Sequence, residues 1–359
     1  MRARIVIVGG GTGGHIIPAL AVARELAGRA EVLFVGTHRG LESRLVPEAG
    51  FPLDLVAAGP LNQVSLATRL RTATQLPMAL VDCVRILRRF GAQAVLGVGG
   101  YASGPGMAAA LLLGIPTLAF EPNAVPGLTN RLVGRFASAA AVNFAPATRW
   151  FRNAQVTGIP VRPEFFSIAA VDASQPPHLL IFGGSQGARI LNTLLPPVAA
   201  ELLRAFPTLT ILHQAGARHA EQTRAAYATA CAGMVGWRVE PFLSNMAECF
   251  ERAQLVLARS GASTVAELAA AGRAALLVPF AAAADNHQQR NAEAMEQAGA
   301  ARMLTEAQLA ENPASLAAEL RALLADRARL AAMGEAARTL AHPRAAAEIA
   351  QRLMGLIGG

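Results

Sequence analysis

The sequence predicts an α/β protein with two doubly wound domains that face a cleft. Short apolar runs typical of buried parallel strands alternate with segments of helical periodicity along most of the 359 residues. Glycine-rich loops follow several of these runs, and the pattern starts again near residue 179. The length is enough for two domains that each bury a core of their own.

The first half contains six predicted strands with helices between them. A helix is expected from Ile17 to about Ala27. The segment Leu66–Phe90 is expected to form two helical segments split at Pro77, because proline removes a helical hydrogen bond. The strands are expected at Ile5–Val8, Val32–Val35, Phe51–Val56, Val95–Val98, Pro116–Phe120 and Ala139–Val142.

The second half repeats this alternation after a turn-rich linker that runs from Gly158 to His178. We expect a first domain over residues 1–160, a second over 161–335, and a C-terminal helical segment over 336–359 that could pack back on the first domain. The strands of the second half are expected at Leu179–Phe182, Leu209–His213, Gly236–Val239, the start of Leu255–Gly272, and Ala275–Val278.

The charged residues exclude several kinds of chemistry. All 32 basic residues are arginine and the formal net charge is +8. Without lysine there is no P-loop lysine, no pyridoxal-phosphate Schiff base and no lysine nucleophile. A basic chain could bind nucleic acid, an anionic membrane or an anionic substrate. Aromatic residues make up only 5% of the chain and no run of five basic residues occurs, so no nucleic-acid partner is expected.

Two further features bear on the cellular compartment. The three cysteines (Cys83, Cys231 and Cys249) are far apart, which fits neither a disulfide framework nor a zinc site and indicates a reducing environment. Ala94–Phe120 carries no charged residue and could be mistaken for a membrane span. Its six glycines and two prolines fall where a strand, loop, helix and second strand need them, so we expect buried α/β core there.

The segment Leu255–Gly272, LVLARSGASTVAELAAAG, predicts a short strand, a turn of small residues and a helix. A helix that begins in such a turn presents backbone N–H groups and the positive end of its dipole, which suits a phosphate. Glu267 lies one turn into the helix. The pattern Thr264-x-x-Glu267 is also typical of a capping box, in which the glutamate only caps its own helix.

The first glycine loop is GGGTGGH, Gly9–His15, and it formally satisfies G-x-G-x-x-G. A NAD site would also need an acidic residue after the next strand, but Gly-Thr-His-Arg follows Val32–Val35, so a NAD site is not expected. His15 stands at the carboxyl end of the first strand. There it could act as a base near neutral pH, or it could only form hydrogen bonds within its loop.

Two more glycine loops, Gly99–Gly104 and Gly183–Ala188, also follow predicted strands and could cradle phosphate. No D-x-D pattern occurs and the five aspartates are scattered, so no metal-held diphosphate is expected. Helix N-termini and an arginine would then stabilise the negative charge of the diphosphate. The arginines of Leu66–Phe90 could face anionic lipid, or could simply favour the end of a helix.

Five motifs, taken in order, resemble the MurG family, which is glycosyltransferase family 28. They are GGGTGGH (Gly9–His15), GVGGYASGP (Gly97–Pro105), GGSQGARILN (Gly183–Asn192), RSGASTVAELAAAG (Arg259–Gly272) and HQQRNA (His287–Ala292). The resemblance implies two Rossmann-like domains of the GT-B type and no cofactor. It also implies inverting transfer of N-acetylglucosamine from UDP-N-acetylglucosamine (UDP-GlcNAc) to the 4-hydroxyl of a lipid-linked muramyl-pentapeptide. This step of peptidoglycan synthesis would take place at the cytoplasmic face of the bacterial inner membrane. The protein would bind the anionic surface of that membrane peripherally.

The same resemblance implies roles for individual residues. His15 would be the catalytic base, with Glu121 and Tyr101 as alternatives on facing loops. The acceptor pyrophosphate would lie at Gly11, Gly99, Gly100 and Ser103. UDP-GlcNAc would be bound by Thr12, Gly13, Gly14, Asn123, Arg162, Ser185, Leu243, Ala262, Ser263, Thr264, Val265, Ala266, Glu267 and Gln288.

The chain departs from the family where Phe120 and Pro122 replace the usual histidine and glutamine, so a polar role there is absent. Three other functions remain open: another UDP-sugar transferase of this fold, an epimerase, and a non-catalytic protein that binds a nucleotide sugar or a lipid carrier. Turnover without a lipid acceptor would identify the epimerase. His15, Glu267 and Gln288 together favour catalysis over simple binding.

Overall fold

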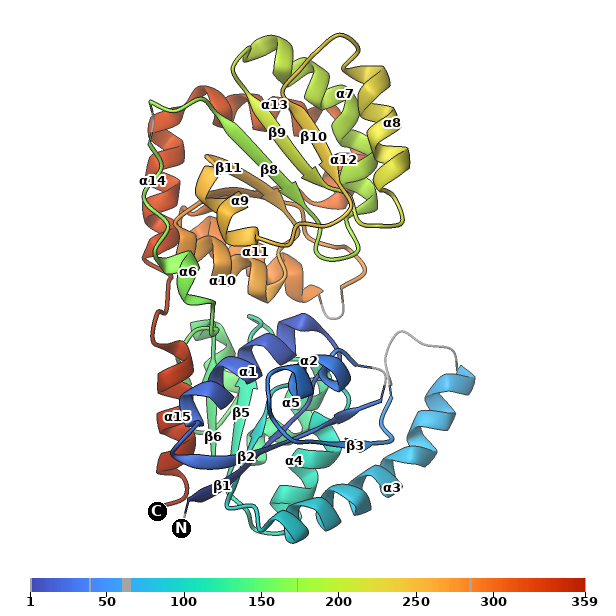
Figure 1. The fold of residues 1–359 in the computed structure, drawn as a ribbon, viewed down its shortest axis with the longest axis vertical. Coiled ribbons are helices and arrows are strands. Elements are labelled where there is room, and N and C mark those ends of the chain that lie inside the picture. Colours follow the sequence, from blue (N-terminus) through green and yellow to red (C-terminus); the bar gives the residue numbers. More distant parts are fainter. Residues whose placement is uncertain (1, 39, 60–65, 173, 284–285, 359) are drawn as a thin grey trace. The chain divides into compact units, whose positions relative to one another are not determined.

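The computed structural model describes residues 2–38, 40–59, 66–172, 174–283 and 286–358, with only the backbone over 66–73. The chain forms two compact units, which are described separately (Figure 1). Unit 1 consists of Met1–Val161 and His342–Gly359, and unit 2 consists of Arg162–Ala341. The C-terminal segment of the chain therefore belongs to unit 1.

Unit 1 is built on a seven-stranded parallel sheet in the order β3-β2-β1-β4-β5-β6-β7. Its central strands are mostly apolar, with IVIV in β1, AVL in β4 and LAF in β5, as expected where helices cover both faces of a parallel sheet. The strands are β1 (Ala3–Val8), β2 (Ala30–Thr37), β3 (Leu53–Val56), β4 (Ala94–Gly97), β5 (Thr117–Glu121), β6 (Ala139–Val142) and β7 (Ala154–Val156).

The helices of unit 1 follow its strands, and the last one returns from the C-terminus to pack against α1. One sequence prediction was wrong: Leu66–Phe90 is a single helix that continues through Pro77. A proline removes only one N–H donor, and the other turns of this 25-residue helix keep theirs. The helices are α1 (Gly13–Leu26), α2 (Glu42–Glu48), α3 (Leu66–Phe90), α4 (Ser103–Leu112), α5 (Leu128–Val133) and α15 (Ala345–Gly355), with 3-10 turns η1 (Gly134–Phe136) and η2 (Ala145–Trp150).

Unit 2 is built on a six-stranded parallel sheet in the order β10-β9-β8-β11-β12-β13. The strands are β8 (His178–Phe182), β9 (Thr210–Gln214), β10 (Trp237–Glu240), β11 (Leu255–Ala258), β12 (Ala274–Leu277) and β13 (Ala301–Met303). The helices are α6 (Pro163–Phe166), α7 (Arg189–Ala205), α8 (Ala220–Ala230), α9 (Met246–Arg252), α10 (Ala262–Ala271), α11 (His287–Gln297), α12 (Glu306–Glu311), α13 (Ala314–Ala325) and α14 (Arg327–Arg338).

Each sheet has one point at which the strand order reverses. The chain adds strands outward from β1 to β3 and then returns to place β4 on the other side of β1. Unit 2 repeats this around β8, with β9 on one side and β11 on the other. In such folds ligands bind beyond the carboxyl ends of the two strands that flank the reversal.

The predicted α/β class with two doubly wound domains is confirmed, and each predicted strand overlaps a strand of the two sheets. Two edge strands, β7 and β13, were not predicted because each has only three residues and pairs on one side. The charge-free segment Ala94–Phe120 forms β4, α4 and most of β5. No helix among the described residues is long and apolar enough to span a membrane.

Candidate functional site

The two glycine loops of unit 1 meet at the strand reversal. β1 and β4 pair in parallel with Val8 opposite Gly97, so the loops that follow them start side by side. The Gly10 N–H donates a hydrogen bond to the carbonyl oxygen of Gly99 at 3.0 Å. A Cβ atom on Gly9 would collide with that carbonyl, and one on Gly100 would collide with the backbone of Gly10. Glycine is therefore needed here for close approach of two backbones.

His15 lies in the first turn of α1, and its ring packs against the second loop. A Cβ atom on Gly99 would lie 2.9 Å from Cε1 and 3.0 Å from Nδ1 of that ring. Thr12 is the exposed N-cap residue of α1, and Gly13 and Gly14 form its first turn. His15 thus lies where the first loop, the second loop and the start of α1 come together.

Two other predicted residues of the second loop differ sharply in exposure. Tyr101 is 49% exposed, so its hydroxyl can reach a ligand. Ser103 is fully buried, and its Oγ accepts a hydrogen bond from the Gly99 N–H at 3.3 Å. The geometry therefore favours a role for Ser103 in shaping the loop.

Glu121 is the last residue of β5 and is buried. Its carboxylate accepts hydrogen bonds from the backbone N–H groups of Asn123 (2.9 Å) and Gly127 (3.1 Å). The side-chain amides of Asn123 (3.1 Å) and Asn130 (3.0 Å) also donate to it. Burial raises the pKa of Glu121, and these hydrogen bonds act in the opposite direction. Both oxygens are engaged by their own loop, which favours loop fixation over proton transfer to a substrate.

In unit 2, helix α10 begins directly after the reversal point, as the motif Leu255–Gly272 predicted. Its N-cap is Gly261, and no side chain caps it. The capping box suggested by Thr264 and Glu267 is therefore wrong, because Thr264 already lies inside the first turn. Gly261 leaves the helix N-terminus sterically open, which suits an anion. Of the predicted donor-binding stretch Ala262–Glu267, Val265 is buried in the core and could contribute only its backbone.

Glu267 and Arg162, both predicted to bind the donor, are neighbours. Arg162 Nη2 lies 4.0 Å from Glu267 Oε1, and the guanidinium stacks over the buried ring of Phe165 at 5.0 Å. The Glu267 side chain is 23% exposed. Burial raises its pKa to about 7, while the positive charge of Arg162 acts to lower it.

Gln288 is tied to the turn before α10. The Ser260 hydroxyl donates to the backbone carbonyl of Gln288 at 2.8 Å, and Gln288 Oε1 accepts from the Phe280 N–H at 3.1 Å. Asn291, one turn later on α11 and fully buried, donates to the Ser260 carbonyl at 3.1 Å. The side-chain amide of Gln288 is therefore held in place beside the α10 turn.

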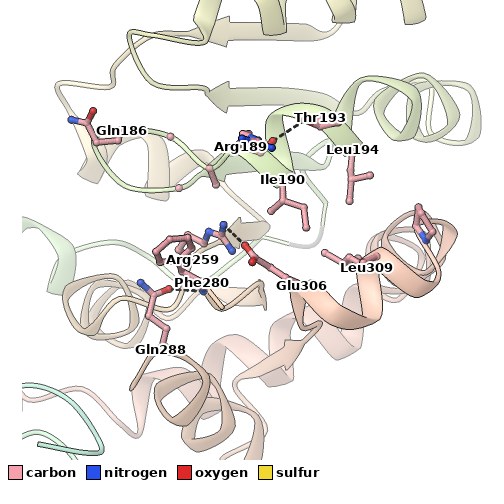
Figure 2. A pocket seen from close by; sticks show the side chains of 15 residues that line it. Gln186, Arg189, Ile190, Thr193, Leu194, Arg259, Phe280, Gln288, Glu306 and Leu309 are labelled. Carbon is pink, nitrogen blue, oxygen red and sulfur yellow. Dashed lines mark hydrogen bonds and ion pairs between the residues drawn. The ribbon is translucent and has the colours of Figure 1, made fainter. Parts of the chain in front are cut away.

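An ion pair between the buried Arg259 and the half-buried Glu306 supports the turn that precedes α10 (Figure 2). Arg259 donates to the carbonyls of Val278 (3.1 Å) and Pro279 (3.0 Å), and its Nη2 lies 2.5 Å from Glu306 Oε1. Its guanidinium also stacks over Phe280 at 5.2 Å. Arg259, Phe280 and Glu306 line a cavity of about 810 Å³ that extends along the start of α7 and α12.

Ser185 and Leu243 lie elsewhere in unit 2. Ser185 is exposed in the loop that follows β8. That loop is compact, because a Cβ atom on Gly187 would collide with the carbonyl of Ala215. Leu243 follows the edge strand β10 and lines a different cavity of about 440 Å³.

Most of the predicted site residues thus lie near the glycine loops after β1 and β4 in unit 1, or near the turn before α10 in unit 2. Glu121 and Asn123 stand at the end of β5 and Leu243 follows the edge strand β10, and neither strand flanks a reversal. Sequence reasoning assigned no role to four polar residues that organise these segments: Arg259, Asn291 and Glu42 are buried, and Glu306 is half-buried. Arg259 and Asn291 stand inside the quoted motifs, where their polarity next to apolar strands was a usable signal. Glu42 and Glu306 could be found only from their contacts in the fold.

Comparison with known proteins identifies the family of this chain. Residues 5–142 match the N-terminal domain of glycosyltransferase family 28, and residues 178–352 match its C-terminal domain. A protein of Solibacter usitatus, named UDP-N-acetylglucosamine--N-acetylmuramyl-(pentapeptide) pyrophosphoryl-undecaprenol N-acetylglucosamine transferase, is 43% identical, and the alignment covers 98% of this chain and 95% of that protein. A protein of the same name from Nitrosococcus oceani is 44% identical, with both chains fully covered.

A solved structure is also similar over nearly its whole length. The crystal structure of MurG from Acinetobacter baumannii superposes with a TM-score of 0.80 at 33% identity. The match covers 98% of this chain and 99% of that chain. The two parallel sheets are therefore those of a GT-B fold, and the chain belongs to glycosyltransferase family 28 as a member of the MurG family.

Proposed function

We propose that this chain transfers N-acetylglucosamine from UDP-GlcNAc to the 4-hydroxyl of undecaprenyl-pyrophosphoryl-MurNAc-pentapeptide. The two substrates are those in the names of relatives that are 43% and 44% identical over nearly the whole chain. In one displacement the 4-hydroxyl oxygen attacks the anomeric carbon, the bond to UDP breaks, and the configuration inverts. The hydroxyl proton passes to a base, and the leaving diphosphate takes the electron pair.

One observation carries the donor half of this proposal. The open N-terminus of α10, Glu267 beside Arg162, and the held amide of Gln288 lie around one turn of unit 2. The helix N-terminus and the guanidinium stabilise the negative charge that develops on UDP. Glu267 accepts hydrogen bonds from the ribose hydroxyls, and Gln288 binds the sugar hydroxyls.

The remaining donor contacts follow the motifs. Ser185 and Arg162 hold the diphosphate, and the backbone at Leu243 reads the uracil. Asn123 contacts the sugar. His15 is the base, which its half-buried place between the two glycine loops supports.

Unit 1 also carries the surface that we propose for membrane binding. Leu132 and Phe136, near the end of α5, are 58% and 57% exposed. Arg131 and Arg135 alternate with them, and α5 packs beside α4, whose Leu112 is also exposed. Exposed apolar side chains among arginines suit the anionic cytoplasmic face of a bacterial inner membrane.

The arginines of α3 give less support to this surface. The Arg69 and Arg71 side chains lie outside the described part of the chain. Arg85 pairs with Asp82 at 3.3 Å, and Arg89 pairs with Asp54 at 2.5 Å, so part of the charge of this helix is neutralised.

The membrane proposal has a direct test. The wild-type protein should co-sediment with phosphatidylglycerol vesicles. The double variant Leu132→Glu, Phe136→Glu should lose this co-sedimentation. The control is Val235→Glu, because Val235 is 89% exposed in unit 2 and should not affect sedimentation. Equal sedimentation of all three proteins would place the membrane surface elsewhere.

The transfer itself is tested by UDP release from UDP-GlcNAc in EDTA, with and without a short-chain analogue of the lipid-linked acceptor. Release that requires the acceptor and survives EDTA supports the metal-independent transferase. Turnover of UDP-GlcNAc without acceptor would identify an epimerase. Donor binding without any release would identify a binding protein.

A further inference from the structure

The buried carboxylate of Glu42 contacts the first glycine loop. Glu42 is the first residue of α2 and is only 1% exposed. Its Oε2 accepts a hydrogen bond from the Gly11 N–H at 2.6 Å. Its Oε1 accepts from both the N–H and the hydroxyl of Thr37, each at 2.9 Å. One side chain thus joins the loop after β1 to the end of β2.

Three glycines make room for this carboxylate. A Cβ atom on Gly10, Gly36 or Gly40 would collide with the Glu42 side chain. These glycines come from the loop after β1, from strand β2 and from the turn before α2. The absence of side chains at these three glycines therefore leaves room for the Glu42 carboxylate.

We propose that Glu42 is a positioning residue for glycosyl transfer, an inference that rests on the function proposed above. It fixes Gly11, two residues before α1 begins, and so sets where α1 places His15 against Gly99. It also occupies the N–H of Gly11, a residue that the family resemblance implies at the acceptor pyrophosphate. An anion at that N–H would have to displace a buried carboxylate that has two other hydrogen bonds, so we expect the acceptor pyrophosphate to use other groups of the two glycine loops.

The three donors point at both oxygens of the Glu42 side chain. A carboxylate accepts hydrogen bonds at both oxygens, whereas a glutamine side chain presents an NH₂ donor at one end. In either orientation of Glu42→Gln, that NH₂ faces the Gly11 N–H or the Thr37 N–H. The substitution therefore breaks one of the two backbone hydrogen bonds while the side-chain volume stays nearly unchanged. It releases either the first glycine loop at Gly11 or the end of β2 at Thr37.

The test compares Glu42→Gln with Glu48→Gln, whose carboxylate is exposed at the other end of α2. Assays run well below the melting temperature of each variant, so that all molecules are folded. We expect kcat of Glu42→Gln to fall about ten- to a hundred-fold, as for a misplacement of about 1 Å at a catalytic group. The affinity for UDP, measured by calorimetry, falls far less than kcat because most of the residues expected to bind UDP-GlcNAc lie in unit 2. Acetate should restore part of the activity of Glu42→Ala by filling the vacated socket.

Two results would overturn the proposal: wild-type kcat in folded Glu42→Gln, or a loss of UDP affinity as large as the loss of kcat. Amide exchange at Gly11, followed by NMR, gives a readout that does not depend on turnover. Faster exchange in Glu42→Gln but not in Glu48→Gln is expected even if the wild-type protein fails to transfer the sugar. Unchanged exchange would contradict the contact, whereas failed transfer alone would contradict only the proposed function.

Discussion

Glu121 ends strand β5 of unit 1 and Glu267 lies in helix α10, which follows strand β11 of unit 2, and the surroundings of these two acidic residues differ. Glu121 is buried and accepts four hydrogen bonds from its own loop. Glu267 is partly exposed, and its nearest cation, Arg162, is 4.0 Å away. Burial raises the pKa of both carboxyls, but only Glu121 has several donors that oppose it.

This difference separates a carboxylate that holds the protein from one that is available to a ligand. The donors around Glu121 are fixed by the Asn123–Asn130 segment, so its hydrogen bonds are complete before any substrate binds. The Glu267 carboxylate can still accept hydrogen bonds, and it lies beside an open helix N-terminus, where a nucleotide hydroxyl could donate to it. By the same comparison, His15 rather than Glu121 is the stronger candidate for the base.

The largest effect is expected for His15→Ala. Loss of a general base should lower kcat about a hundred- to ten-thousand-fold. UDP affinity should fall far less, because most of the residues expected to bind UDP-GlcNAc lie in unit 2. The measurement is acceptor-dependent UDP release together with calorimetry. If Glu121→Gln, rather than His15→Ala, gave the large loss of kcat with normal stability, the comparison of the two carboxylates would fail.

A large loss of stability is expected for Glu121→Ala. Removing the carboxylate leaves buried donors of the Asn123–Asn130 segment without their acceptor, which should cost about 3 kcal/mol of unfolding free energy. Urea denaturation measures this. Glu25→Ala, at an exposed position of α1, is the control and should change stability by less than about 0.5 kcal/mol. Equal stability of the two variants would show that the hydrogen bonds of Glu121 are not needed.

Glu267→Gln tests the other carboxylate through pH. Its pKa of about 7 lies above the usual value of 4.5, so the folded protein binds the proton more tightly than the unfolded chain does. Stability of the wild type should therefore fall as pH rises from about 4.5 to 7, and glutamine removes this dependence. At pH 8 the variant should be more stable by at most about 3 kcal/mol.

The same variant should raise the KM for UDP-GlcNAc about ten-fold, because glutamine cannot accept hydrogen bonds at both ends from the ribose hydroxyls. Denaturation at two pH values and steady-state kinetics check both parts. A lower melting temperature at pH 8 with an unchanged KM would indicate that Glu267 serves only its own helix.

The smallest effects concern the two threonines that could head a capping box. Thr305 forms one: its hydroxyl accepts from the Gln308 N–H at 3.2 Å, and the Gln308 side chain accepts from the Thr305 N–H at 2.8 Å. Thr305→Ala should cost about 1 kcal/mol, whereas Thr264→Ala should cost less than about 0.5 kcal/mol. Thermal melts of both variants measure the difference, and a larger loss for Thr264 would reverse the assignment of caps.

Much of the fold was predictable because it depends on local periodicity. Apolar runs of four to six residues mark strands that are buried on both faces, and each is followed by a helical pattern that covers it. The predicted glycine loops after Val8 and Phe182 follow β1 and β8, the strands around which the order of each sheet reverses. Three-residue edge strands and the continuity of α3 through Pro77 were missed, because so short a run has no period and one proline does not decide the fate of a long helix.

The polar residues that organise the site were not predictable in the same way. His15, Glu267 and Gln288 stand in recognisable motifs, so the sequence by itself determined that they belong to a site. Only the tertiary structure decided that Glu121 is closed by its own loop and that Glu42 reaches the first glycine loop from 31 residues away in sequence. The physical reason is that burial and hydrogen-bond partners depend on contacts between distant segments, whereas periodicity and turn preference are properties of neighbouring residues.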